Sequence, residues 1–216
     1  MYGLGQLGDI EGKIYTNWNI IDEVPFGARL ERYGIDFGYS NDPTAIVAIY
    51  RHDGGFILDE LTYLKGLSNK QIADIISNQD EKALSVADSA EPKSIDEIAS
   101  YGLMIVGAEK GKDSVNFGID LVQQQKISMT KRSTNLIKEY RNYLWMIDKD
   151  GKTLNKPEDV FNHTMDALRY GISSIKKLKS TYQNPKQKED AIFKQAMARK
   201  KKRGEGGTRK HLFVGR

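Results

Sequence analysis

Two aspartates stand where strands of a sheet are predicted to expose their side chains. Asp36 lies in an alternating stretch that predicts a strand with two unlike faces. Gly34 and Gly38 flank it on the same face, and their missing side chains predict room above the carboxylate for a metal ion or a phosphate. Asp88 ends a second short strand, predicted over residues 83–88. Because ligands collect near the carboxyl ends of strands in α/β sheets, both carboxylates are candidates for one site.

A predicted helix supplies a third carboxylate and a histidine. Pro157 is expected to open this helix, with Leu168 and Ile172 anchoring it on the core. His163 and Asp166 are three residues apart, so they share one helical face. The helix can therefore present both side chains towards the sheet.

Three carboxylates and at most one histidine would make a site of hard oxygen ligands. The chain contains no cysteine, which excludes thiolate metal sites and disulfides. Mg²⁺ or Mn²⁺ therefore fits the ligand set better than zinc. Two such ions, about 3.5–4 Å apart, would suit in-line attack of water on a phosphodiester. Taken singly, each residue has an ordinary explanation as a solvated aspartate, a helix cap or a surface histidine, so the prediction depends on their combination.

The elements that must position these residues predict an α/β fold. Three consecutive strands at residues 32–38, 45–50 and 56–63, joined by short turns, predict an antiparallel meander. Helices and strands then alternate: a helix capped by Ser68 and Gln71, a strand at 83–88, a helix from Pro92, a strand at 103–106, a helix at 115–122, a strand at 127–131, a helix capped by Ser133, a hairpin at 145–152 and a final helix at 157–175. The order predicts a mixed sheet with helices on both faces.

Charge divides the 216 residues unevenly. The net charge is +4, but residues 176–216 hold 14 of the 33 Lys and Arg and 3 of the 29 Asp and Glu. We therefore predict a folded domain at 29–178 and a basic, largely disordered tail at 179–216. The tail is expected to contact nucleic acid or an acidic partner, with a solvated terminus as the alternative. Glycine-rich residues 1–28 are predicted to be the end of a preceding domain or a strap on this one.

An acidic body that holds DNA needs local cations. Six residues are candidates for contacts to backbone phosphates, which give affinity without sequence preference, although each could equally be a solvated surface residue. They are Lys110, Lys112, Lys131, Arg132, Lys149 and Lys152. The last two lie on the predicted hairpin, which could cover the cleft or adjust access to it.

Several classes of protein are excluded or disfavoured. Neither Gly12-Lys13 nor Gly111-Lys112 completes the phosphate-binding pattern G-x-x-x-x-G-K-[ST]. The sequence has no apolar run of about 18 residues and no signal-peptide pattern at its start. A soluble, cytoplasmic protein that is not secreted and does not contact a membrane is therefore expected.

Three segments together resemble the C-terminal nuclease domain of the large terminase subunit of tailed phages. They are Gly34–Gly38, Val86–Pro92 and Asn162–Tyr170, and Lys110–Asp120 is also similar. The resemblance covers about residues 30–175 and implies an RNase H-like fold. It implies that Asp36, Asp88 and Asp166 are metal ligands with His163 beside them. The implied activity is Mg²⁺- or Mn²⁺-dependent cleavage of double-stranded DNA, a concatemeric viral genome, during packaging in an infected bacterium.

The same resemblance implies partners and leaves alternatives open. The implied partners are a motor ATPase domain, a small terminase subunit and the portal or procapsid. No ATPase domain is expected in this chain. That domain would either have been removed by truncation or be encoded as a separate chain. Alternatives are another RNase H-like enzyme such as a resolvase or integrase, an actin-like or sugar-kinase ATP-binding domain, and a non-catalytic DNA-binding module. Gly34–Ser40 is similar to the phosphate-binding hairpin of actin-like and sugar-kinase ATPases, which need two such domains.

Overall fold

The structure is a computed structural model that describes residues 12–181, with side chains described as far as Ile175. The chain divides into two compact units, Met1–Lys176 and Lys177–Arg216, and the fold below is that of the first. Nearly all of the predicted basic tail, 179–216, lies outside the described residues. No helix in the described part of the chain is both long enough and apolar enough to cross a membrane.

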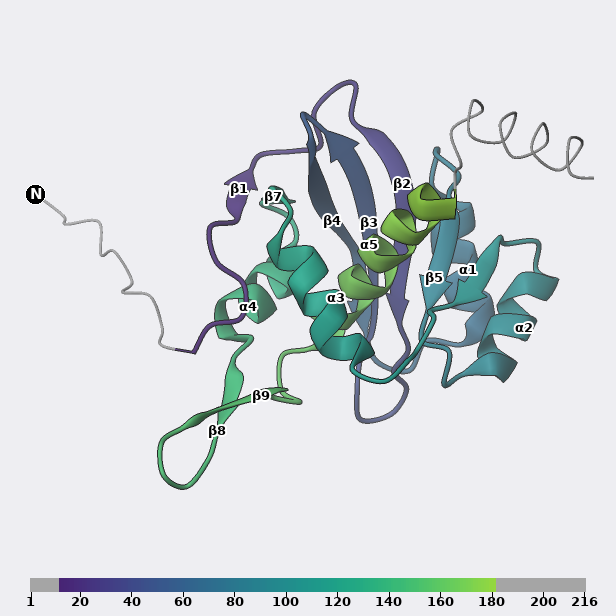
Figure 1. The fold of residues 1–216 in the computed structure, drawn as a ribbon. Helices are drawn as coiled ribbons and strands as arrows, with labels where there is room; N and C mark the ends of the chain where they lie inside the picture. Colours follow the sequence, from purple (N-terminus) through teal and green to yellow (C-terminus); the bar gives the residue numbers. More distant parts are fainter. Residues whose placement is uncertain (1–11, 182–216) are drawn as a thin grey trace, which may run out of the picture. The chain divides into compact units, whose positions relative to one another are not determined.

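A seven-stranded mixed sheet forms the middle layer (Figure 1). Its strands lie in the order β1-β7-β4-β3-β2-β5-β6. The β2–β3 and β3–β4 pairs are antiparallel and the remaining pairs are parallel, so the predicted meander followed by parallel strands is confirmed. The bounds are β1 Asn19–Ile21, β2 Arg29–Asp36, β3 Thr44–His52, β4 Gly55–Leu64, β5 Leu84–Ala87, β6 Ile105–Gly107 and β7 Ile127–Thr130.

Helices cover both faces of this sheet, as predicted (Figure 1). Their bounds are α1 Asn69–Ser77, α2 Pro92–Ser100, α3 Ser114–Gln123, α4 Thr134–Asn142 and α5 His163–Thr181. Along β3, Val47 and Ile49 join the core under α3, α4 and α5, whereas Ile46 and Ala48 join the core under α1 and α2. This alternation follows from the two-residue period of a strand. The predicted capping box of Ser68 and Gln71 opens α1.

Gly34 makes room for helix α5, which crosses the sheet over β2 and β3 (Figure 1). A Cβ atom at Gly34 would lie 2.0 Å from the backbone oxygen of Ala167 in α5. At Gly38 it would lie 2.3 Å from the backbone oxygen of Asp42, in the turn after β2. The prediction that these two glycines clear space for a metal ion or phosphate is therefore wrong. Gly34 instead allows the backbone of α5 to approach β2 closely, and Gly38 allows the turn after β2 to fold back on itself.

Helix α5 begins later than predicted. Pro157 does not open it, because this proline is the last residue of strand β9 (Thr153–Pro157) and pairs with Trp145 at the start of β8 (Trp145–Ile147). The predicted hairpin is present, but it extends further along the chain than residue 152. Phe161, just before the helix, has a left-handed φ of 62°. His163 consequently lies at the very start of α5, where its side chain reaches the edge of the sheet.

The described part of the predicted link, 1–28, packs on the domain. Strand β1 pairs in parallel with β7 at one edge of the sheet, and Ile14 and Tyr15 are buried in the core. The Trp18 ring stacks on Tyr15 and on Tyr140, with centroid distances of 4.9 and 4.7 Å. These contacts are those of a strap on the domain, while the division of the chain at residue 28 stays a prediction.

Candidate metal centre

Asp36 and Asp88 lie beside each other at the carboxyl ends of two parallel strands. Strand β2 pairs with β5 in a register that matches Ile35 with Ala87, and an aspartate follows each of these two residues, Asp36 at the end of β2 and Asp88 just after β5. Asp36 is the last residue of β2, so the expectation that it lies inside the strand is corrected. Because the two strands run in the same direction, both carboxylates emerge at the same edge of the sheet.

Helix α5 brings three further polar side chains to this edge. His163 Nδ1 lies 3.0 Å from Asp36 Oδ2, and the Tyr170 hydroxyl donates a hydrogen bond of 3.2 Å to Asp88 Oδ2. Asp166 lies between these two residues on the same helix and is only partly exposed. The structure therefore brings the predicted histidine to one predicted carboxylate, and Tyr170 to another.

The charges of the three aspartates act on one another. The pKa of Asp36 is raised to about 6, chiefly by burial and also by the negative charges of Asp166 and Asp88, while the hydrogen bond from His163 opposes the rise. The same hydrogen bond raises the pKa of His163 above its ordinary value, although burial opposes this effect. Three carboxylates that repel one another at one edge of a sheet form a site that favours cations.

Each carboxylate has a basic side chain as its partner in the protein. Asp36 pairs with His163, Asp88 pairs with Lys110, and Asp166 accepts a hydrogen bond of 2.6 Å from Arg169 Nη2. Among the described residues, no three His, Asp or Glu side chains are gathered closely enough to enclose a metal ion in this arrangement. By ligand type and charge, however, the three carboxylates suit a divalent cation such as Mg²⁺ or Mn²⁺.

The buried Glu139 of α4 is a part of this centre that the sequence did not reveal. Its carboxylate is 1% exposed and accepts hydrogen bonds from the backbone N–H of Thr164, at 2.6 Å, and from the Tyr63 hydroxyl, at 2.8 Å. The Tyr63 ring meets the His163 ring edge-on, with centroids 6.1 Å apart. Glu139 therefore fixes the first turn of α5, and with it His163, relative to the sheet.

Arg169 is a second residue missed at the sequence level, although a signal for it was present. It follows Asp166 by three residues, which is the spacing at which helical side chains pair. Its side chain is 7% exposed. The aliphatic part packs against Gly118 of α3, where a Cβ atom would lie 2.7 Å from Arg169 Cγ. Arg169 therefore both orients Asp166 and joins α5 to α3.

The six predicted DNA-binding cations lie in three different settings. Lys110 and Lys112 lie in the loop between β6 and α3, where Lys110 pairs with Asp88 of the centre. Lys149 and Lys152 lie in the turn of the β8–β9 hairpin and are exposed. Lys131 and Arg132 follow β7, at the other side of the β2–β4 meander. The ion pair with Asp88 therefore favours Lys110, and Lys112 shares its loop.

Arg132 has a structural partner that weakens its candidacy as a DNA contact. Its Nε donates a hydrogen bond of 2.7 Å to Asp59 Oδ1, and its Nη2 pairs with Asp59 Oδ2. The Asp59 side chain is 2% exposed, and the Thr130 hydroxyl donates to it at 2.6 Å. Lys131, in contrast, pairs at 2.9 Å with Asp22, and both side chains are well exposed.

We predict that Arg132→Ala lowers the free energy of unfolding by about 2 kcal/mol, because it leaves a buried carboxylate without its cation. Lys131→Ala is the matched control and should change the free energy of unfolding by less than about 0.5 kcal/mol, since its ion pair is exposed. Urea denaturation of both variants measures the difference. Equal stability of the two variants would mean that the Arg132–Asp59 pair does not support the fold.

The Asp36–His163 pair predicts how the stability of the metal-free protein depends on pH. Both groups have raised pKa values in the folded protein, so the folded chain holds their protons more tightly than the unfolded chain does. This stabilisation is complete below the unfolded pKa values and is lost as the pH rises through the folded ones. In EDTA, the free energy of unfolding should therefore fall by about 1–2 kcal/mol between pH 5 and 8. The Asp36→Asn variant should lose most of this slope, and a wild-type stability that rises with pH would contradict the prediction.

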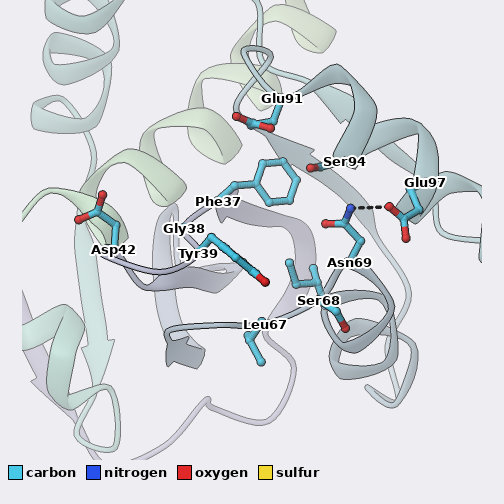
Figure 2. Close-up of a pocket in the computed structure, with 11 residues that line it drawn as sticks. Phe37, Gly38, Tyr39, Asp42, Leu67, Ser68, Asn69, Glu91, Ser94 and Glu97 are labelled. Carbon is cyan, nitrogen blue, oxygen red and sulfur yellow. Dashed lines mark hydrogen bonds between the residues drawn. The ribbon is translucent and has the colours of Figure 1, made fainter.

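A pocket of about 550 Å³ adjoins the centre on its α1 and α2 side (Figure 2). It meets the centre through Asp42, whose Oδ1 lies 3.9 Å from His163 Nε2. Every charged side chain in its lining is acidic: Asp42, Glu91 and Glu97. Figure 2 shows the hydrogen bond that links Glu97 of α2 to Asn69 of α1 across the pocket. Because carboxylates repel phosphates, the pocket does not suit the DNA backbone.

Known proteins share both the sequence and the fold of this domain. The terminase large subunit of Bacillus phage SPP1 is 38% identical over 149 residues, which cover 65% of this chain and 35% of that protein. The terminase large subunit of Escherichia phage T5 is 30% identical over 188 residues, which cover 76% of this chain and 42% of that protein. This chain therefore spans well under half the length of these relatives.

A solved structure shows the same relationship in three dimensions. The nuclease domain of the large terminase g2p from bacteriophage SPP1, crystallised with bound Mn, aligns with a TM-score of 0.65 and 30% sequence identity, covering 74% of this chain and 97% of that domain. The RNase H-like fold expected from the sequence is thereby confirmed. Residues 36–174, which run from the first candidate ligand past the last, match the family described as the terminase RNAseH like domain. The chain therefore belongs to the family of terminase RNase H-like domains.

Proposed function

We propose that this chain is a metal-dependent nuclease that cuts double-stranded DNA, a concatemeric viral genome, during packaging by a terminase. The observation that carries the proposal is that Asp36 and Asp88 stand side by side at the carboxyl ends of two parallel strands, with the charge of Asp166 on α5 acting on Asp36, in a chain that belongs to a terminase family. The bound Mn of the SPP1 nuclease domain supports a divalent cation as the cofactor.

We propose that the three aspartates hold Mg²⁺ or Mn²⁺, as two ions. When bound, such ions activate the attacking water and stabilise the leaving oxygen of the phosphodiester. The carboxylates of Asp36 and Asp88 are the ligands from the sheet, and Asp166 is the ligand from α5. His163, 3.0 Å from Asp36 Oδ2, orients that carboxylate and limits its rotation. Arg169 has the same orienting role for Asp166.

DNA is proposed to approach the centre away from the acidic pocket of Figure 2. Lys110, which pairs with Asp88, and Lys112 in the same loop before α3 are the candidate phosphate contacts. Strand β9 of the hairpin lines another pocket, of about 380 Å³, together with Asp166 and Arg169. This arrangement supports the proposal that the hairpin, which carries Lys149 and Lys152, adjusts access to the centre.

The partners are proposed from the relatives, whose chains are longer than this one. A motor ATPase domain, a small terminase subunit and the portal or procapsid would work with this domain in the cytoplasm of an infected bacterium. The basic tail, 179–216, is proposed to contact DNA or an acidic surface of that assembly, because Lys and Arg far outnumber Asp and Glu in it while the rest of the chain is net acidic.

Plasmid digestion tests the proposed function. The purified chain should convert supercoiled plasmid to fragments without sequence preference in Mn²⁺ or Mg²⁺, and should leave it intact in EDTA. Cleavage that proceeds equally well in EDTA would overturn the metal mechanism. An intact plasmid in every metal, with a protein that is folded by circular dichroism, would overturn nuclease activity for the isolated chain.

A further inference from the structure

Lys110 differs from the other two basic side chains that pair with the aspartates. Its side chain is 45% exposed and extends from the loop between β6 and α3. Arg169 is 7% exposed and packs against α3, and His163 is 19% exposed and touches the Tyr63 ring. Removing Arg169 or His163 from its carboxylate would disrupt packing, whereas Lys110 can leave Asp88 by rotating its flexible side chain into solvent.

Asp88 keeps its orientation without Lys110. Its Oδ1 accepts a hydrogen bond of 2.7 Å from the backbone N–H of Ala90, and its Oδ2 accepts one of 3.2 Å from the Tyr170 hydroxyl. Tyr170 itself is buried in α5. These two contacts, one from the turn after β5 and one from the helix, hold the carboxylate at the edge of the sheet. Lys110 therefore adds positive charge to a carboxylate that is already positioned.

We propose that Lys110 is a displaceable counter-ion that competes with the divalent cation for Asp88 and, once displaced, binds a phosphate of the DNA near the centre. This inference rests on the proposed function and assigns Lys110 two successive partners. A cation bound to Asp88 repels the Lys110 ammonium, which lies on the same carboxylate. The released ammonium stays within reach of the centre because its loop is bounded by β6 and α3. Phosphate is the anion that the substrate supplies there.

The proposal predicts that one substitution changes two affinities in opposite directions. In the full chain without DNA, Lys110→Ala should bind Mn²⁺ about tenfold more tightly than wild type, because a competing positive charge is gone. In Ca²⁺, which offers the same oxygen coordination, the variant should bind a DNA duplex about fivefold more weakly, since one phosphate contact is lost. Titration calorimetry measures the first affinity and fluorescence anisotropy the second.

Lys112→Ala is the matched control for the Mn²⁺ titration, because this lysine lies in the same loop and, among the described residues, forms no ion pair with an aspartate. It should leave the affinity for Mn²⁺ within twofold of wild type. Unchanged or weaker Mn²⁺ binding by Lys110→Ala would overturn the competition, and unchanged DNA binding would overturn the second role. If the wild-type protein itself binds no Mn²⁺, the proposed metal centre is wrong. If the wild-type protein binds Mn²⁺ and Lys110→Ala binds it equally well, only the proposed competition is wrong.

Discussion

Asp36→Asn is expected to slow metal-dependent DNA cleavage by about a thousandfold, which corresponds to ~4 kcal/mol of lost transition-state stabilisation. Asparagine keeps the shape of the side chain but removes the negative charge that a divalent cation needs as a ligand. The fold should survive, because the pKa of Asp36 is raised by burial and by the charges of Asp166 and Asp88, so its charge is unfavourable in the metal-free protein.

Single-turnover plasmid cleavage in saturating Mn²⁺ measures this effect. Asp96→Asn is the matched control, since Asp96 is an exposed aspartate on α2 and is not one of the proposed ligands. The control should cleave at the wild-type rate. Cleavage by Asp36→Asn at the wild-type rate, with Asp96→Asn unchanged, would remove Asp36 from the catalytic centre.

Gly34→Ala is expected to affect both stability and activity. The new methyl group would meet the backbone oxygen of Ala167 at 2.0 Å and its carbonyl carbon at 2.6 Å, and a helix backbone cannot yield as a flexible side chain can. Helix α5 must therefore move away from β2, which should cost about 3 kcal/mol of unfolding free energy. The same movement displaces His163 and Asp166 from Asp36 and should slow cleavage about a hundredfold.

Gly111→Ala provides the control for stability, because a Cβ atom at Gly111 would have no heavy atom within 4 Å. Urea denaturation should place this control within about 0.5 kcal/mol of wild type. A Gly34→Ala variant as stable as the control would show that α5 does not press on β2 as closely as the structure indicates. If Gly34→Ala is destabilised but cleaves normally, α5 tolerates displacement and the positioning argument is wrong.

The sequence predicted the parts of the fold that depend on local patterns. The alternation of Tyr33 and Ile35 with Gly34 and Asp36 is a property of one strand, and it correctly placed Asp36 on the opposite face from the two apolar side chains. The capping box at Ser68 is equally local. The match of Ile35 with Ala87, which sets Asp36 beside Asp88, is a pairing between distant segments that no local pattern specifies.

The errors arose where contacts between distant segments override local preference. Pro157 suits the first turn of a helix, but its pairing with Trp145 makes it the end of a strand. Glu139 belongs to the predicted helix after Ser133 and looks like a solvated side chain, yet it is buried because Thr164 and Tyr63 supply its hydrogen bonds. The buried partner of Arg132, Asp59, likewise comes from another strand.

The central claim is that Asp36, Asp88 and Asp166 together hold a divalent cation. Anomalous diffraction from crystals of the protein soaked in Mn²⁺ tests this claim most directly, because Mn²⁺ scatters X-rays anomalously and light atoms scarcely do. The account predicts one or two strong anomalous peaks within coordination distance of the three carboxylates, and no peak in crystals of Asp36→Asn. Wild-type crystals without such a peak, or with Mn²⁺ bound only elsewhere on the protein, would contradict it.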